Sequence, residues 1–440
     1  MIGLVVNPVA GVGGPAGLAG SDGADVQRLA LARGAHFRAQ ERATIALRVL
    51  ASRHPSLEIA TAAGAMGEDA VRAAGLQARV VYASGARAVA PRTGGRPRTG
   101  EDPADAPVLG DPPVLGRADA SEPGTSASDT SAAVAALAAA GASLILVAGG
   151  DGTLRDAAAG LADAAATTPE NLPDSSPPRH SDADSGEDLR SSGQQPAVLG
   201  IPSGVKMYSP VFAVSPRVAG ALAAEWIDGT LPTAEREVLD VDEEGMRHAR
   251  VHPVLYGMLR VPFRVGRTQS RKAATPVSEA AAVAAAARGV VKRMLPGIRY
   301  LLGPGSTTAE VARQLGIRKS PLGVDVILDG RQLLAAASEE QLLAEVAQGP
   351  AQAVVTVIGG QGFLLGRGNQ QLSASVIRVL GDDPLMVVAP EQKLIDLHGR
   401  PLIVETGDAD LDARLAGHIR IVTGVGTASL YAVAAPDLAP

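Results

Sequence analysis

The sequence contains no cysteine and very few aromatic residues. The absence of cysteine excludes disulfides, thiolate catalysis and thiolate metal sites, so any bound metal needs oxygen ligands. Aromatic residues make up 2% of the chain, Trp226 is its one tryptophan, and Ala, Val, Leu and Gly dominate, so we expect an aliphatic core. A length of 440 residues fits about three domains, or two domains with long insertions.

A strong charge excess and a long apolar run are also missing. The net charge of -6 argues against a general nucleic-acid binder. The longest uncharged stretch, Thr130–Gly150, is alanine-rich and contains Gly141, so we expect a helix, a turn and a strand rather than a membrane span. Met1–Pro8 has no basic segment and no long apolar segment, so it predicts a first strand rather than a signal peptide. We therefore expect a cytoplasmic protein with no membrane or nucleic-acid partner.

Apolar runs and helical patterns alternate through the first half of the chain. This alternation predicts a doubly wound α/β domain over residues 1–230, with a parallel sheet and helices on both faces. The predicted strands are Ile2–Val6, Leu57–Ala62, Arg79–Ala83, Ser143–Ala148 and Ala197–Ile201. The predicted helices are Val26–Ala51, Gly67–Ala74, Ala132–Ala140, Leu154–Ala166 and Val218–Trp226.

Two polar segments interrupt that alternation, at about 88–129 and 167–196. They are rich in Pro, Ser, Gly and Asp and have little apolar spacing, so we expect disordered surface insertions. From residue 235 to about 435 the pattern changes to shorter strand-like runs, beginning with Arg236–Val241 and Arg250–Leu259. This part predicts antiparallel hairpins in a second, β-rich domain.

The strongest functional signal is the run Gly149–Thr153, which reads Gly-Gly-Asp-Gly-Thr and follows a buried-strand pattern. Glycines allow close approach of the backbone to a polyanion, and the N-terminus of the following helix attracts negative charge. A carboxylate in such a place repels the ligand unless it serves a metal or accepts a proton, so Asp151 favours a kinase over a passive anion binder. The simpler alternative is a Gly-Asp-Gly turn between a strand and a helix.

Further loops are expected near the same site. Asn7-Pro8 and Pro202–Gly204 follow other strands of the sheet, and Lys206 either contacts phosphate or lies on the surface. Gly303–Thr308 precedes the helical Ala309–Leu315, so it predicts a second phosphate cradle or a helix cap at Ser306. Asp325 is expected near that cradle, the alternative being a strand carboxylate that faces solvent.

Three motifs together resemble those of the ATP-NAD kinase family, in the branch that includes the acetoin-catabolism X proteins. They are Gly149–Thr153, Gly200–Met207 and the glycine-rich Ile358–Gln371. The resemblance implies an α/β N-terminal domain, a β-rich C-terminal domain and a nucleotide site between them. It also implies ATP and NAD as nucleotide substrates, Mg²⁺ as the metal, and a homo-oligomer.

By that resemblance, Asp151 is the catalytic residue, which accepts the proton of the ribose 2′-hydroxyl of NAD. Motif and position together nominate a larger set for nucleotide binding, and no residue is assigned to the metal. The set is Asn7, Gly149, Gly150, Gly152, Thr153, Pro202, Ser203, Gly204, Lys206, Gly305, Ser306, Thr307, Thr308, Asp325, Gly360, Gln361, Asn369 and Gln370.

One family feature is missing. NAD kinases carry an Asn-Glu or Asn-Asp pair at the start of the second domain, where this sequence has Tyr256–Pro262. The predicted activity is an NAD kinase that uses ATP or polyphosphate. One alternative is a small-molecule or lipid kinase that shares the glycine-rich loop, although the chain lacks a membrane-binding face. Another is a nucleotide-binding regulator without turnover, linked to acetoin catabolism.

Overall fold

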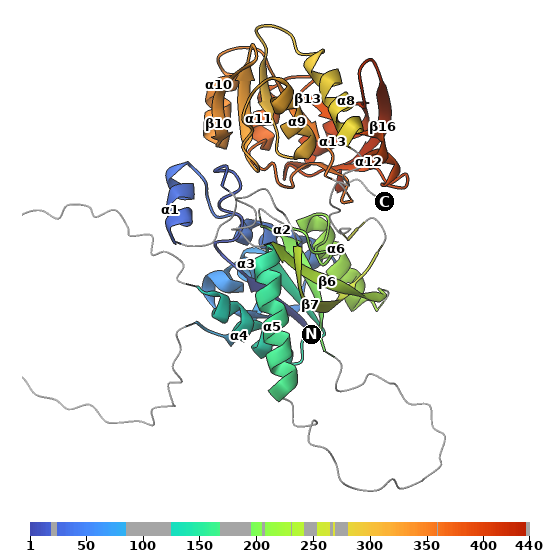
Figure 1. The fold of residues 1–440 in the computed structure, drawn as a ribbon. Coiled ribbons are helices and arrows are strands. Elements are labelled where there is room, and N and C mark those ends of the chain that lie inside the picture. The colour runs from blue at the N-terminus through green and yellow to red at the C-terminus, as the bar shows by residue number, and fades with distance from the viewer. Residues whose placement is uncertain are drawn as a thin grey trace, which may run out of the picture.

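A five-stranded parallel sheet forms the centre of the first domain in the computed structural model (Figure 1). The described residues are 1–18, 24–84, 125–167, 195–204, 207–229, 231–241, 253–264, 267–268, 280–358 and 360–436. The strand order is β3-β2-β1-β4-β5. These strands are β1 (Ile2–Val6), β2 (Glu58–Ala62), β3 (Gln77–Tyr82), β4 (Leu144–Gly149) and β5 (Ala197–Pro202).

The helices of this domain cover both faces of the sheet. From β1 the chain first steps outward to β2 and β3 and then returns to β4 and β5, so right-handed crossovers place helices on opposite sides. They are α2 (Ala39–Arg53), the 3₁₀ turn η1 (Gly64–Met66), α3 (Glu68–Ala73), α4 (Ala127–Ala139), α5 (Asp151–Thr167) and α6 (Pro216–Ile227). Helix α1 (Ala24–Ala32) instead buries Ala30 in a separate small cluster with Val12, Ala16 and Ala35. Strands β4 and β5 are buried along their whole length, as a sheet covered on both faces requires.

Glycines allow the helices on each face to pack closely. A Cβ atom on Gly160 of α5 would lie 2.2 Å from the carbonyl oxygen of Ser131 in α4. On α6, a Cβ atom on Gly220 would lie 2.1 Å from the carbonyl oxygen of Ala46 in α2. Both distances are shorter than any real contact, so only glycine fits at these two helix crossings.

The second sheet is mixed, with strand order β10-β9-β8-β11-β13-β15-β16-β14-β12. Strands β8, β11, β13 and β15 run parallel, whereas β9 and β16 are antiparallel to β8 and β15. The strands are β8 (Arg299–Leu302), β9 (Val324–Leu328), β10 (Arg331–Ala337), β11 (Ala351–Thr356), β12 (Phe363–Leu365), β13 (Leu385–Val388), β14 (Leu402–Val404), β15 (Gly417–Val422) and β16 (Ala428–Ala434). The helices are α8 (Ala280–Val291), α9 (Ser306–Gln314), α10 (Glu339–Val346), α11 (Ala374–Val379), α12 (Glu391–Ile395) and α13 (Ala409–Leu415).

An antiparallel hairpin, β6 (Thr233–Val241) and β7 (Pro253–Pro262), connects the two domains in sequence. The predicted pairing of these two segments is therefore confirmed. The sequence placed the hairpin in the second domain, but Val238, Leu259 and Val261 share a buried core with β1 to β5. The hairpin packs on the first domain because these apolar side chains find their partners there.

Several sequence-based boundaries need correction. The helix predicted over Val26–Ala51 is two helices, because Gly34 adopts a left-handed conformation (φ 80°) between α1 and α2. Most of the two predicted insertions lies outside the described residues. The first nevertheless extended too far, because Ser126 and Asp129 form the capping box of α4. Each hydrogen-bonds the other's backbone N–H, which fixes the first turn.

The predicted fold class is confirmed, with a parallel α/β domain followed by a domain built on a mixed sheet. The uncharged stretch before Gly150 divides into α4, a turn and β4, as Gly141 indicated. Among the helices of the described residues, none has the length and hydropathy that a membrane span requires.

Candidate functional site

The glycine-rich loop joins β4 directly to α5. Helix α5 begins at Asp151, three residues earlier than the sequence indicated, so Asp151, Gly152 and Thr153 form its first turn. Backbone N–H groups of a first turn have no partner within the helix and carry its positive dipole end. This geometry suits a phosphate group.

The two glycines that flank Asp151 have different environments. A Cβ atom on Gly149 would lie 2.3 Å from Oγ1 of Thr153, so glycine is required there by packing. At Gly152 the nearest atom to an added Cβ would be Oδ2 of Asp240, at 3.8 Å. The fold itself therefore leaves room at Gly152, and the space lies over the first turn of α5.

Asn7 fixes this turn from the neighbouring strand. Its side-chain amide donates to Oγ1 of Thr153 at 3.1 Å, and its Oδ1 accepts from the amide of Val9 at 3.2 Å. The two predicted binding residues Asn7 and Thr153 thus lie together at the carboxyl ends of β1 and β4. Ligands of parallel α/β sheets bind at this edge.

Asp151 is almost fully buried, with 2% of its surface exposed, and it is bound by the segment that follows β5. Its Oδ2 accepts from the amide of Tyr208 at 2.5 Å. Its Oδ1 accepts from the amide and the hydroxyl of Ser209, at 3.1 and 2.6 Å. Oδ1 therefore has two donors and Oδ2 one among the described residues, which leaves Oδ2 with capacity for a further hydrogen bond.

Burial raises the pKa of Asp151 from 3.8 to about 7. Desolvation is the largest cause, since a charged carboxylate loses its water shell. The hydrogen bonds from Ser209 and Tyr208 lower the pKa but do not cancel that effect, and the negative charge of Asp240 raises it further. A carboxyl group that titrates near neutral pH exchanges protons readily under physiological conditions.

The segment after β5 contacts the glycine-rich loop through its backbone. The amides of Ser203 and Gly204 both donate to the carbonyl oxygen of Gly149, each at 2.9 Å, so Pro202–Gly204 lies beside Gly149 and Gly150 as predicted. Ser203 is buried, and its hydroxyl lies 3.3 Å from the carbonyl of Ile201. Lys206 lies outside the described residues.

The second domain reaches this segment with two predicted residues. The Gln361 side chain donates to the carbonyl of Met207 at 2.8 Å, and Gln370 donates to the carbonyl of Gly204 at 3.3 Å. Asn369 instead binds its own turn, donating to the carbonyl of Leu364 and accepting from the amide of Gly366. The glycine-rich segment of the second domain thus meets the edge of the first sheet.

The predicted second cradle forms the start of α9. Gly305 (φ 126°) occupies the position before the helix, so Ser306 is not the cap but the first helical residue. Thr307 and Thr308 are fully buried; the Lys393 ammonium lies 3.3 Å from Oγ1 of Thr307, and Oγ1 of Thr308 donates to the carbonyl of Gly305.

This cradle lies on the same edge of the second sheet as the loop that carries Gly360 and Gln361. It follows β8, whereas that loop follows the parallel neighbour β11. The side chain of Thr356, at the end of β11, also lies next to Gly305.

Asp325 lies beside Leu302, at the end of β8 that leads into the cradle. The solvent-facing alternative is wrong, because Asp325 is completely buried. Its carboxylate accepts from the amides of Ser320 and Ala336, both at 2.8 Å, and from the Ser320 hydroxyl. Lys319 supplies the counter-charge at 3.5 Å. These contacts fix the loop between α9 and β9.

Several residues that shape the site were missed by sequence reasoning. Ser209 and Tyr208 hold Asp151, and the glycine-rich turn after Asn7 packs on Ser203, where a Cβ atom on Gly11 would lie 1.9 Å from the carbonyl oxygen. The glycine density of residues 11–17 was a readable signal. Ser209 gave none, because a single serine near a glycine-rich motif has no characteristic pattern.

A magnesium ion fits this site only in part. Within the described ranges there is no group of three or more His, Asp or Glu residues arranged to hold a metal. Asp240, whose Oδ2 would lie 3.8 Å from a Cβ atom on Gly152, is paired with Arg155 at 2.9 Å. Because Mg²⁺ is often held by nucleotide phosphates, water and only one or two carboxylates, such an ion would enter with the nucleotide.

The fold is that of a two-domain protein, with a parallel sheet whose glycine-rich loop opens a helix beside a second domain built on a mixed sheet. Residues 2–167 match the family model of the ATP-NAD kinase N-terminal domain, and residues 295–433 match that of the ATP-NAD kinase C-terminal domain. The two matches cover more than half of the chain, which therefore belongs to the ATP-NAD kinase family. Searches of curated proteins and of solved structures gave no match.

Proposed function

We propose that this protein transfers a phosphoryl group from ATP, or from polyphosphate, to the 2′-hydroxyl of NAD and so forms NADP. The observation that supports this most directly is Asp151, a buried carboxyl with a pKa raised to about 7 in the first turn of α5. A group of that pKa accepts a proton at neutral pH, and the amides around it attract phosphate. Membership of the family supports NAD as the acceptor.

The proposed reaction uses the chain's own groups as follows. The first-turn amides of α5, including those of Gly152 and Thr153, bind the donor phosphates. The oxygen of the acceptor hydroxyl bonds to the γ-phosphorus of ATP while Oδ2 of Asp151 accepts the proton of that hydroxyl. The bond between the γ-phosphorus and the oxygen of the leaving ADP breaks. Phosphoryl transfer proceeds through a loose transition state, so positioning and neutralisation of charge contribute more than base strength. Magnesium carried by the nucleotide would supply part of that neutralisation.

A second candidate is a nucleotide-binding regulator without turnover. It is favoured by the three internal hydrogen bonds that already engage Asp151, and by Tyr256–Pro262 standing where NAD kinases have an Asn-acid pair. Such a protein would bind nucleotides between the domains and respond through its conformation. For either function we propose free nucleotides as partners, a cytoplasmic location and a homo-oligomeric state.

Incubation of the purified protein with Mg-ATP and NAD, with NADP read by an NADP-specific dehydrogenase, tests the proposal. We expect NADP from the wild type and a rate lower by about 10²- to 10⁴-fold in Asp151→Asn, the usual contribution of a general base. Asp163→Asn, an exposed position on the same helix, is the matched control. Polyphosphate in place of ATP tests the donor.

Nucleotide binding by calorimetry separates the two candidates. A wild type that binds ADP and NAD but forms no NADP at any Mg²⁺ concentration would support the regulator. Equal rates in the wild type and Asp151→Asn would remove Asp151 from the mechanism.

A further inference from the structure

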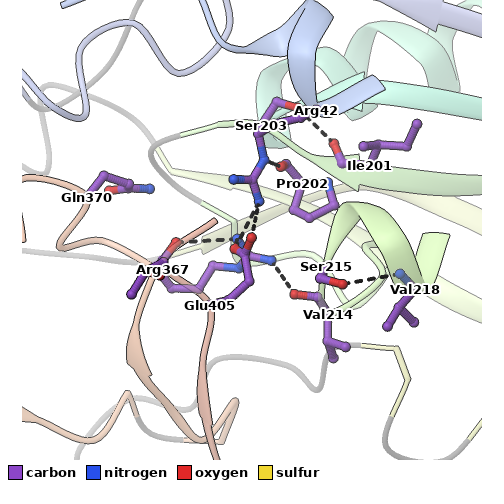
Figure 2. Close-up of polar contacts among 12 residues, drawn as sticks. Arg42, Ile201, Pro202, Ser203, Val214, Ser215, Val218, Arg367, Gln370 and Glu405 are labelled. Carbon is purple, nitrogen blue, oxygen red and sulfur yellow. Dashed lines mark hydrogen bonds and ion pairs between the residues drawn. The ribbon is translucent and has the colours of Figure 1, made fainter. Parts of the chain in front are cut away.

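One carboxylate of the second domain holds two arginines that both reach the segment after β5. Figure 2 shows Arg42 and Arg367 converging on Glu405. Arg42, on α2, donates to Oε1 and Oε2 of Glu405 at 2.9 Å each. Arg367 lies 3.3 Å from Oε2. We refer to these three residues as the Arg42–Glu405–Arg367 bridge.

The bridge carries one excess positive charge, and two of its three side chains are buried. Glu405 is 5% exposed and Arg367 3% exposed, and burial lowers the pKa of Arg367 to about 10, so it stays cationic at neutral pH. The guanidinium of Arg367 also lies 4.7 Å from the centre of the Phe363 ring. Buried charges need well-placed partners, and removal of one partner from such a group is costly. The geometry of all three side chains is therefore tightly coupled.

Both arginines also bind the backbone of the first domain at the two ends of Pro202–Val214. Nε of Arg42 donates to the carbonyl of Pro202, and Nη2 of Arg367 donates to the carbonyl of Val214 at 2.9 Å. Between these ends lie two sets of groups that bind the glycine-rich loop: the amides of Ser203 and Gly204 on Gly149, and the donors from Tyr208 and Ser209 on Asp151. The bridge thus controls the segment that surrounds the candidate base.

We infer that Arg42 and Glu405 are positioning residues: they hold the second domain closed over the nucleotide site and fix the segment Pro202–Val214 against Asp151. This inference rests on the proposed function for its link to turnover. The link between the domains is supported by the hydrogen bonds of the bridge and does not depend on the proposed function. Arg42 is the informative residue, because its contact with Glu405 joins the two domains, whereas the contact of Arg367 with Glu405 lies within the second domain.

Arg42→Gln tests the inference with the least disturbance, since it leaves the buried Arg367–Glu405 pair intact. Arg42→Lys keeps the charge but replaces two separate donor nitrogens, Nε on Pro202 and Nη2 on Glu405, by a single ammonium nitrogen. Arg53→Gln is the matched control, because Arg53 lies on the same helix and its ion pair with Asp228 joins α2 to α6 within the first domain.

Domain closure is measured without reference to activity. The chain has no cysteine, so Ser56→Cys and Ser375→Cys, exposed positions in the first and second domains, accept a donor and an acceptor dye. We expect lower energy transfer in Arg42→Gln and Arg42→Lys than in the parent and in Arg53→Gln. We also expect ADP affinity to fall about tenfold, within the usual range of coupling between sites.

Turnover supplies the second readout. A closure defect raises KM for NAD and lowers kcat together, whereas loss of global stability alone lowers the amount of active protein and leaves KM unchanged. Unchanged dye transfer and unchanged ADP affinity in both Arg42 variants would overturn the inference. If the wild type forms no NADP, the proposed function fails while the dye and ADP measurements still decide the bridge. If Arg42→Gln does not fold, Arg42→Lys carries the same test.

Discussion

The hydroxyl oxygen of Ser209 lies 2.6 Å from Oδ1 of Asp151 and also 2.9 Å from the carbonyl oxygen of Leu239 on β6. A hydroxyl has one proton, so it donates to one of these acceptors at a time. An ionised Asp151 is the stronger acceptor, whereas a neutral Asp151 releases the proton to Leu239. The protonation state of the candidate base is thereby linked to the hairpin that follows the first domain.

The rate of phosphoryl transfer should depend on the protonation of Asp151. Because burial raises its pKa to about 7, kcat should rise as the pH increases through about 7 and level off about one pH unit above that. A pH-rate profile of the wild type, compared with Asp151→Asn and Asp163→Asn, measures this. The rise in kcat near pH 7 should be absent only in Asp151→Asn. A wild-type kcat that does not change with pH would contradict the assignment of Asp151 as the proton acceptor.

Stability should follow the same ionisation. The folded-state pKa of Asp151 lies above its unfolded value of 3.8, so the proton is held more tightly in the folded protein. The stabilisation from Asp151 is therefore complete below about pH 4 and is lost as the pH rises towards 7. Urea unfolding at several pH values, taken as wild type minus Asp151→Asn, isolates this contribution from those of other groups. A difference that does not change between pH 4 and 7 would show that Asp151 titrates normally.

Ser209→Ala should weaken the fold and shift the pH profile upward. The change removes a hydrogen bond from Asp151 and the acceptor of the Leu239 amide at 3.0 Å, and an unsatisfied buried group costs about 1–3 kcal/mol. Since the Ser209 bond lowers the pKa of Asp151, its loss should move the rate limb above 7. Ser131→Ala, whose hydroxyl donates to backbone carbonyls of α4 and α5 and not to Asp151, is the control. An upward shift of the pH-rate profile in both Ser209→Ala and Ser131→Ala would argue against a specific role of Ser209.

The sequence predicted the first sheet well because buried parallel strands are continuous apolar runs. β1 agreed at both ends, and the edges of β4 and β5 agreed within one residue. The sequence also predicted the loops at the carboxyl edge of the sheet, because each of these loops begins where a predicted strand ends. It did not predict that Arg42 meets Glu405, because ion pairs between residues 363 positions apart depend on how two domains pack. Nor did it reveal that Asp325 is buried, because a single carboxylate in a strand pattern has the same sequence signature on either face.

Gly152→Ala should separate nucleotide binding from stability. An added Cβ meets no atom closer than 3.8 Å, and alanine favours helix over glycine by up to about 1 kcal/mol. The melting temperature should therefore stay the same or rise. If phosphate lies over this turn, ADP affinity should fall at least about tenfold, or about 1.4 kcal/mol. Asp163→Ala on the same helix should leave ADP affinity unchanged. Unchanged ADP affinity in Gly152→Ala would place the phosphate elsewhere.

Gly11→Ala should damage the site through a clash that its matched control lacks. Gly11 has φ 79° and its Cβ would lie 1.9 Å from the carbonyl oxygen of Ser203, whereas Gly75 has φ 81° and open space around it. Both alanine variants suffer the left-handed backbone strain, about 1–2 kcal/mol. Only Gly11→Ala must also displace Ser203, at a further cost of about 1–3 kcal/mol.

Because the Ser203 amide binds the carbonyl of Gly149, that displacement should lower ADP affinity as well. Denaturant unfolding and calorimetry on both variants measure the two effects. Equal losses in Gly11→Ala and Gly75→Ala would show that strain alone acts, and that the turn after Asn7 does not support the phosphate loop.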